Sequence, residues 1–350
     1  MKNQRVLIIG ALVVLAVAAF FFSQQQTKVS DIKVGIILGF TGPIESLTPD
    51  MASGAELAFK EATDSGELLG GANIIPVRAD STCVDSAAAS TAAEDLIAQG
   101  IVAIMGADCS GVTGAIASNV AVPHGVVMVS PSATSPALTD LDDNGLFFRT
   151  APSDARGGEV LADITKDNGV SSVAITYVNT DYGVGLADVY KAALEAHGIT
   201  VTTTTAHEGD KADYSAEVGV LSSAGGDALA VLGYLDQGGN QIIQGSLDSG
   251  AFDTFVLSDG MIGDSLTDTF GSDLDKSFGS MPGSLGEGAQ MFAKYAEENG
   301  VNPSVYVGES YDAAALIVLA MQAGESTDKS SIASNIMDVA NGPGEKIMAG

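Results

Sequence analysis

The sequence predicts an α/β protein built from two doubly wound, parallel-sheet lobes that are joined by a hinge. Short apolar runs alternate with Ala-rich helical stretches, and the 350-residue length exceeds what one hydrophobic core usually serves. Runs such as Val34 to Leu38 are almost continuously apolar, as expected for strands of a sheet that helices cover on both faces. We therefore expect parallel strands connected by right-handed crossovers.

The elements follow one another in strand and helix order, with a break at Thr150 to Asp154, where Pro152 and Ser153 interrupt the series. This break divides the chain into a first lobe from residue 30 to 152 and a second lobe that begins at residue 153. We expect strands at 33–40, 74–78, 101–105, 125–129, 147–149, 172–177, 200–205, 228–232 and 254–257, and helices at 51–62, 87–98, 111–120, 157–165 and 185–195. The Gly- and Ser-rich stretch 245–288 is expected to form ordered loops.

The charge balance excludes one class of partner. The chain has 15 Lys and Arg against 44 Asp and Glu, which gives a net charge of −29. This charge repels phosphate backbones and anionic lipid, so nucleic acid is not expected as a partner. Acidity alone keeps a protein soluble whatever its ligand, so we interpret it as a solvated surface.

The N-terminus, residues 1–26, resembles an export signal. Lys2 and Arg5 precede an uncharged apolar run from Val6 to Phe22, and polar residues follow. No small-x-small cleavage site ends the run, so residues 6–22 are also able to remain as a membrane anchor. We predict a protein exported to the periplasm, either cleaved or anchored to the inner membrane.

Two cysteines, Cys83 and Cys109, fall in the part of the chain expected to be exported. In an oxidising compartment a disulfide would stabilise the fold by roughly 3 kcal/mol, mainly by restricting the unfolded chain. The alternative, two reduced and buried thiols, stays open at this point.

Hydroxyl side chains follow two neighbouring strands. Ser110 comes after the strand that ends near Gly106 and opens a helix, and the segment Ser130 to Thr134 follows the next strand. Ligands of open α/β sheets bind beyond the carboxyl ends of the strands, where free N–H groups at helix starts attract anions. These segments suit a carboxylate, although each is equally able to act as a helix cap without a ligand.

An amino-acid ligand also needs a negative group for its ammonium and walls for its side chain. Asp259 directly follows the predicted strand 254–257, and Tyr182 and Tyr234 follow two other strands of the second lobe. We choose Asp259 as the ammonium acceptor and the tyrosines as walls. Taken singly, each of these residues is more commonly part of an ordinary loop.

Enzyme, metal and cofactor signatures are absent from the sequence. The three histidines show no metal-ligand spacing, and the chain has no G-x-S-x-G, Walker A or complete dinucleotide motif. Ser326 to Lys329 matches S-x-x-K without its companion motifs and is interpreted as a helix start. Asp140 to Gly145 matches half a calcium loop but has Ala151 where a Glu belongs, so a turn is expected. We predict a binding protein without catalytic residues, metal or cofactor.

Five segments, taken in order, resemble the branched-chain amino-acid-binding family of periplasmic proteins, the type I solute receptors of ABC transporters. They are Thr41 to Ile44, Cys83 with Cys109 and Ser110, Ser130 to Thr134, Phe148 to Asp154, and Asp181 to Gly183. Each segment alone is a weak signal, whereas the five in this order are specific. The likeness spans most of residues 32–350.

The resemblance implies a role for each candidate residue. Ser110 and Thr134, with the backbone at Ser132 and Ala133, would hold the ligand on the first lobe, while Tyr182, Tyr234 and Asp259 would close from the second. It also implies a Cys83–Cys109 disulfide, a hinge at 148–154, a second lobe ending at 281, and a return of residues 282–350 to the first lobe. A neutral or branched-chain amino acid would be captured by hinge closure and delivered by a monomer to a membrane permease.

Two departures from the family pattern leave alternatives open. Ser46-Leu47-Thr48 replaces a segment that often carries an aromatic wall, and the chain stops at Gly350, where relatives usually continue, so it has the appearance of a C-terminal truncation. The same fold would also serve an amide, urea-like or carboxylate solute. With an uncleaved N-terminus it would serve as a tethered sensory domain.

Overall fold

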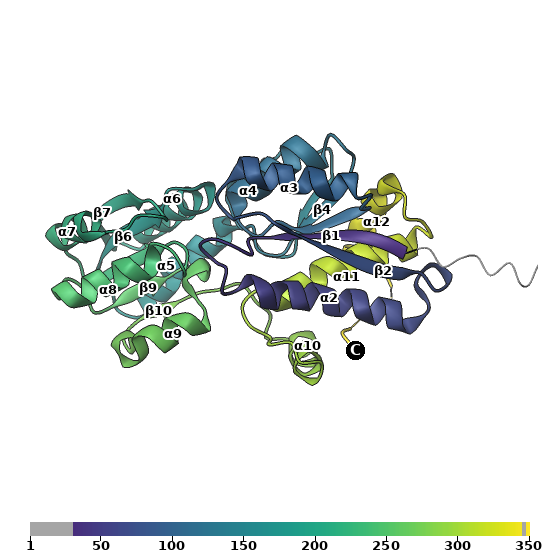
Figure 1. Cartoon of the computed structure of the whole chain (residues 1–350). Helices are drawn as coiled ribbons and strands as arrows, with labels where there is room; N and C mark the ends of the chain where they lie inside the picture. The colour runs from purple at the N-terminus through teal and green to yellow at the C-terminus, as the bar shows by residue number, and fades with distance from the viewer. Residues whose placement is uncertain (1–30, 345–347) are drawn as a thin grey trace, which may run out of the picture.

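The computed structural model describes residues 31–344 and 348–350, which form two lobes side by side (Figure 1). Each lobe contains one five-stranded sheet, and every paired strand in both sheets is parallel. The predicted fold class is therefore confirmed. We call the lobe around the N-terminal sheet the first lobe and the other the second lobe.

The first lobe has the strand order β2-β1-β3-β4-β5. Helices α3 and α4 cover one face of this sheet and α2 and α11 cover the other (Figure 1). The strands are β1 (Asp31–Leu38), β2 (Asn73–Asp80), β3 (Ala103–Gly106), β4 (Val127–Ser130) and β5 (Phe147–Arg149), and the helices are α2 (Thr48–Ser65), α3 (Ser86–Ala98), α4 (Ser110–Ile116), α10 (Glu287–Glu298), α11 (Val307–Ala323) and α12 (Lys329–Asn341).

The second lobe has the strand order β10-β9-β8-β6-β7. Its central strand β8 is completely buried, because helices pack on both faces of the sheet. The strands are β6 (Ser172–Val178), β7 (Thr200–His207), β8 (Ala228–Leu232), β9 (Phe255–Leu257) and β10 (Phe278–Gly279), and the helices are α5 (Asp154–Asp167), α6 (Asp181–Ala196), α7 (Ser215–Ala224), α8 (Gly239–Ser249) and α9 (Asp264–Phe270).

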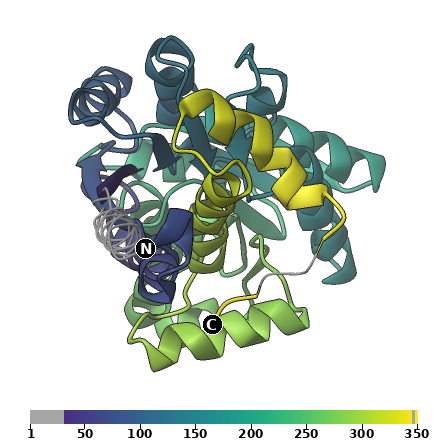
Figure 2. The ribbon, with the colours of Figure 1, turned by 90° about the vertical axis from the view of Figure 1, so that its right-hand side faces the viewer.

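The chain crosses between the lobes twice within the described residues. The first crossing, residues 150–153, runs from β5 to α5, and the second runs from β10 to α10. Figure 2 shows α10 at the same end of the molecule as the C-terminus, where a Cβ on Gly350 would lie 3.3 Å from the ring of Tyr295. The strands fall on either side of the predicted boundary at 152, while the exact boundaries at 152 and 281 stay a prediction.

Two expectations about local structure need correction. The helix expected over 111–120 ends at Ile116, and a π-helical turn, Ala117–Ala121, continues it. The stretch 245–288 contains α9 and β10 in addition to the predicted strand at 254–257, which is β9. Short elements among Gly and Ser residues show too little periodicity to be predicted. The helix start near Ser326 is confirmed, since α12 begins at Lys329.

No helix within the described residues is long and apolar enough to cross a membrane. The predicted signal or anchor, residues 1–26, lies outside the described residues. No group of three or more His, Cys, Asp or Glu that could hold a metal ion occurs in the part of the chain that the structure describes.

The start of α3 offers a test of local stability. Asp85 precedes this helix, and its Oδ1 accepts hydrogen bonds from the backbone N–H groups of Ala87 and Ala88, both at 2.9 Å. We expect Asp85→Ala to lower the free energy of unfolding by about 1 kcal/mol in urea titration. Asp95→Ala, at an exposed position within the same helix, is the control and should change it by less than about 0.5 kcal/mol. Equal effects of the two substitutions would contradict the capping role.

Candidate functional site

A cavity of about 30 Å³ lies between the lobes, beyond the carboxyl ends of strands from both sheets. This is the position at which open α/β sheets bind ligands. Loops from the two lobes face each other there, and part of the wall comes from α2 and from the start of α11. The lining residues are Ile44, Leu47, Met51, Asp108, Cys109, Ser110, Ser132, Tyr182, Tyr234, Asp259, Gly260 and Tyr306.

The first lobe contributes two predicted serines to this cavity. Ser110 is the first residue of α4, and its Oγ accepts a hydrogen bond from the backbone N–H of Ser135 at 3.1 Å. Ser132 follows β4 and donates its hydroxyl to the carbonyl of Asp108 at 3.2 Å. The loops after β3 and β4 are thus tied to each other, which fixes the positions of both hydroxyl groups.

The other two predicted residues of this segment do not line the cavity. Ala133 is completely buried, and its N–H donates to Ser130 Oγ at 3.0 Å. Thr134 is also buried, and its carbonyl accepts from the N–H of Asp154 at 2.9 Å. The backbone of both residues is thus used in holding the loops, whereas the buried Thr134 Oγ1 has no hydrogen-bond partner among the described residues. Ligand contact by Ala133 and Thr134 stays a prediction.

The second lobe contributes a stacked pair of tyrosines. The rings of Tyr182 and Tyr234 lie 5.2 Å apart with an interplanar angle of 21°. Tyr182 is held close to the start of α6, where Thr180 caps the helix by accepting from Gly183 N. Both rings are nearly fully buried and form one flat wall of the cavity. Such an aromatic wall suits the apolar part of a small ligand.

Asp259 is the buried anion of the site, with 7% of its surface exposed. Its Oδ1 accepts from the hydroxyl of Tyr182 at 2.7 Å, and its Oδ2 accepts from the hydroxyl of Tyr306. Burial raises the pKa of Asp259, while the hydrogen bonds from the two tyrosines act in the opposite direction. A ligand ammonium placed here would restore the stability of the charged form.

Tyr306 and Asp108 belong to the site but were not predicted. Tyr306 precedes α11 with a positive φ of 63° and reaches Asp259 from the first lobe. Asp108 accepts from Gly39 N at 2.6 Å, from Ser81 Oγ at 3.0 Å and from Cys109 N at 2.9 Å. Burial raises the pKa of Asp108, and these hydrogen bonds partly offset the shift. Asp108 lies two residues before Ser110, just after the end of β3, so the search for polar residues that follow strands could have found it. Tyr306 follows no strand.

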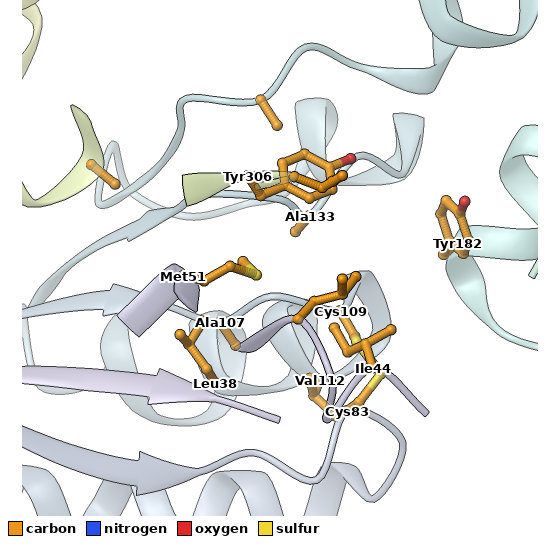
Figure 3. Packing of buried hydrophobic residues seen from close by; sticks show 14 of the residues in the cluster. Leu38, Ile44, Met51, Cys83, Ala107, Cys109, Val112, Ala133, Tyr182 and Tyr306 are labelled. Atoms are coloured by element: carbon orange, nitrogen blue, oxygen red, sulfur yellow. A yellow bond between two sulfur atoms is a disulfide. The ribbon is translucent and has the colours of Figure 1, made fainter. Parts of the chain in front are cut away.

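Apolar side chains and a disulfide complete the first-lobe wall. Cys83 and Cys109 are joined with an S–S distance of 2.04 Å, which confirms the predicted pairing. Figure 3 shows Ile44, Met51 and the disulfide on the first-lobe side, with Tyr182 approaching from the opposite side. Leu47 stands where an aromatic wall was expected from the resemblance, and it lines the cavity.

The two lobes are in direct contact around the cavity. The N–H of Ser46 donates to Asp236 Oδ2 at 2.9 Å, and the N–H of Asp236 donates to the carbonyl of Pro43 at the same distance. On the other side, Ser135 Oγ donates to the carbonyl of Asp181 at 3.1 Å. A volume of about 30 Å³ holds one or two waters. This volume is smaller than an amino acid.

The chemistry of the lining favours binding over catalysis. It offers hydroxyl groups, buried carboxylates and apolar walls, and none of its residues is Lys, Arg or His. Such a set recognises a ligand that carries a positive group, because a buried carboxylate is costly until it is paired. The geometry brings Ser110, Ser132, Tyr182, Tyr234 and Asp259 together, while their roles in binding remain predictions.

Comparison with known proteins places the chain in a family. A family model described as periplasmic binding protein matches residues 31–340. The chain belongs to the periplasmic binding protein family. The Leu/Ile/Val-binding protein homolog 1 of Brucella melitensis is 30% identical to this binding protein over 313 residues, which cover 87% of the chain and 81% of the relative. Homolog 3 of the same organism is 35% identical over 214 residues, 60% of this chain and only 56% of that relative.

Solved structures agree with this assignment of the binding protein. An ABC transporter substrate-binding protein from Desulfitobacterium hafniense in complex with Leu is 25% identical, with 89% of each chain covered and a TM-score of 0.71. A solute-binding protein from Rhodopseudomonas palustris in complex with p-hydroxybenzoic acid is 17% identical, covers 87% of this chain and 84% of its own, and has a TM-score of 0.73. The second likeness concerns the fold alone.

Proposed function

We propose that this protein captures a free α-amino acid with an aliphatic side chain outside the cytoplasm and delivers it to the permease of an ABC transporter. The observation that carries the proposal is the placement of Ser110 and Ser132 on one lobe opposite Asp259 on the other, across one cavity. Hydroxyl and backbone N–H groups suit the ligand carboxylate, and Asp259 suits its ammonium. The ligand would thus be held by both lobes at once.

Capture would work by hinge closure. A ligand that contacts both lobes binds the closed form more tightly than the open form and therefore shifts the equilibrium toward closure. Residues 150–153 and the segment after β10 are the two crossings that such a motion would bend. The closed form is then the state that the permease would recognise. This scheme requires no covalent chemistry.

A carboxylate solute without an ammonium is the second candidate, because one structural relative is named as a complex with p-hydroxybenzoic acid. The cavity lining argues against such a ligand here. It contains Asp108 and Asp259 but no cationic side chain. An acidic ligand lacking an ammonium would face these carboxylates without any compensating charge.

Calorimetric titration of the purified protein with the common amino acids and with p-hydroxybenzoate tests the proposal. We expect at least one amino acid to bind and the benzoate not to bind. Ser110→Ala should weaken amino-acid binding by about ten-fold or more, because a hydrogen bond to a charged carboxylate is lost. The matched control is Ser223→Ala, on the exposed face of α7, which should leave affinity unchanged. Failure of every amino acid to bind would refute the proposal.

A tethered sensory domain differs from a transport receptor in its N-terminus. The mass of the exported protein separates the two possibilities, since a cleaved protein lacks residues 1–26 and a tethered one retains them.

A further inference from the structure

A second and larger cavity, of about 140 Å³, adjoins the first at Asp259, which lines both. It lies in the second lobe beside the two crossings between the lobes. Pro152 and Ser153 of the first crossing form part of its wall, and Ser280 to Pro282, directly after β10, form another part. Apart from Asp259, none of the residues assigned to ligand binding above lines this second cavity.

A second buried carboxylate, that of Asp154, lines this cavity. Asp154 is the first residue of α5 and has only 4% of its surface exposed. Its Oδ2 has no hydrogen-bond partner within residues 31–344 and 348–350. Burial, and next the negative charge of Asp259, raise the pKa of Asp154 well above its usual value. Two neighbouring acids thus share one wall of the cavity.

The nearby arginines form no salt bridge with this pair of acids among the described residues. Arg149 attracts Asp154, but the hydrogen bonds of its guanidinium go to the carbonyls of Ala133 and Ser135 and to Thr139 Oγ1. Arg156 borders the cavity, yet it pairs with Glu159 and its side chain is 67% exposed. Neither arginine forms a salt bridge with either acid in the described part of the chain.

The remaining walls are suited to an alkyl chain. Val160, Leu161, Leu186 and Met281 line the cavity, so most of its surface is apolar between the two acids and the serines. A cavity of about 150 Å³ holds a benzene molecule, which has six carbon atoms. The space at Asp154 therefore accommodates a short methylene chain that ends in one polar group.

We propose that the amino acid bound by this protein carries a second ammonium group at the end of its aliphatic side chain, and that Asp154 receives this group in the 140 Å³ cavity. The proposal rests on the function proposed above and names its ligand class, a diamino acid of the size of lysine or ornithine. The α-ammonium compensates Asp259 and the side-chain ammonium compensates Asp154. A ligand with only one ammonium group leaves the negative charge of one buried carboxylate less completely neutralised, which is energetically unfavourable.

The test compares L-lysine with L-norleucine by calorimetric titration, because norleucine has the same carbon skeleton without the terminal ammonium. We expect lysine to bind at least ten-fold more tightly than norleucine. Equal or tighter binding of norleucine would overturn the proposal while leaving amino-acid capture intact. Failure of both ligands and of all other amino acids would instead refute the proposed function itself.

Asp154→Asn adds a second measurement, which is made only after thermal unfolding has shown that the variant is folded. This substitution should reduce the preference for lysine over norleucine to near unity. Asp163→Asn, at an exposed position of the same helix that pairs with His197, is the control and should retain the preference. An undiminished preference in Asp154→Asn would overturn the assignment of this carboxylate. The wild-type comparison remains decisive if the variant does not fold.

Discussion

Replacing Asp259 by asparagine is expected to weaken amino-acid binding about 100-fold or more in calorimetric titration. Asp259 is buried, and the only partners of its carboxylate oxygens among the described residues are neutral hydroxyl groups and backbone donors. Removing one member of a buried charge pair typically costs about 2–5 kcal/mol of binding free energy. Asparagine preserves the shape of the side chain, so the loss reports on charge rather than on packing.

The stability of this variant distinguishes lost binding from lost folding. Because the folded-state pKa of Asp259 is raised above its unfolded value, ionisation at neutral pH opposes folding of the ligand-free protein. Asparagine removes that cost, so the thermal unfolding midpoint should be unchanged or higher. Asp253→Asn, an exposed carboxylate paired with Lys276 in the same region, should leave ligand affinity unaffected. Retained affinity in Asp259→Asn would exclude Asp259 as the ammonium acceptor.

Removing the disulfide, as Cys83→Ala with Cys109→Ala, is expected to lower the free energy of unfolding by about 3 kcal/mol, as urea titration measures it. The bond joins cysteines 26 positions apart and so restricts a loop of moderate size in the unfolded chain. Cys109 also lines the cavity and directly precedes Ser110, so we expect ligand affinity to fall as well. The affinity loss should be smaller than that of Asp259→Asn.

Chemical reduction supplies the control for this prediction. Wild-type protein in reducing buffer should lose a similar amount of stability, because the same constraint is removed without changing a side chain. The double alanine variant should not respond to the reductant, since the structure contains no free cysteine among its described residues and the sequence has only two cysteines. An unchanged unfolding midpoint in the variant would contradict the stabilising role.

Much of the fold was predictable because its signals are local. Buried parallel strands produce unbroken apolar runs such as that in β1, and the breaks between elements coincide with Gly, Pro and Ser residues. The stretch 245–288 was the exception. Its strand β9 matches the strand predicted at 254–257, whereas β10 has only two residues, which is too few for a periodic pattern.

The site was predictable to the extent that its residues follow strands. Ser110, Ser132, Tyr182, Tyr234 and Asp259 were found from this position and from the family resemblance, and all five line the cavity. Tyr306 was missed because it reaches the site from the start of α11, in contact with a residue 47 positions earlier in the sequence. Thr134 was placed at the ligand from its hydroxyl and from the family resemblance; it does not line the cavity, and its contact with a ligand stays a prediction.

The hydrogen bond from Tyr306 to Asp259 joins the two lobes directly. In the proposed hinge mechanism it would stabilise the closed form, together with the hydrogen bond from Ser46 to Asp236. Less of the ligand's binding free energy is then consumed by closure, which raises the apparent affinity. The same contacts would increase the population of a closed but unloaded receptor, which would compete with the loaded one for the proposed permease. Under the proposed function, tight capture at low solute concentration would therefore come with weaker discrimination between full and empty carriers.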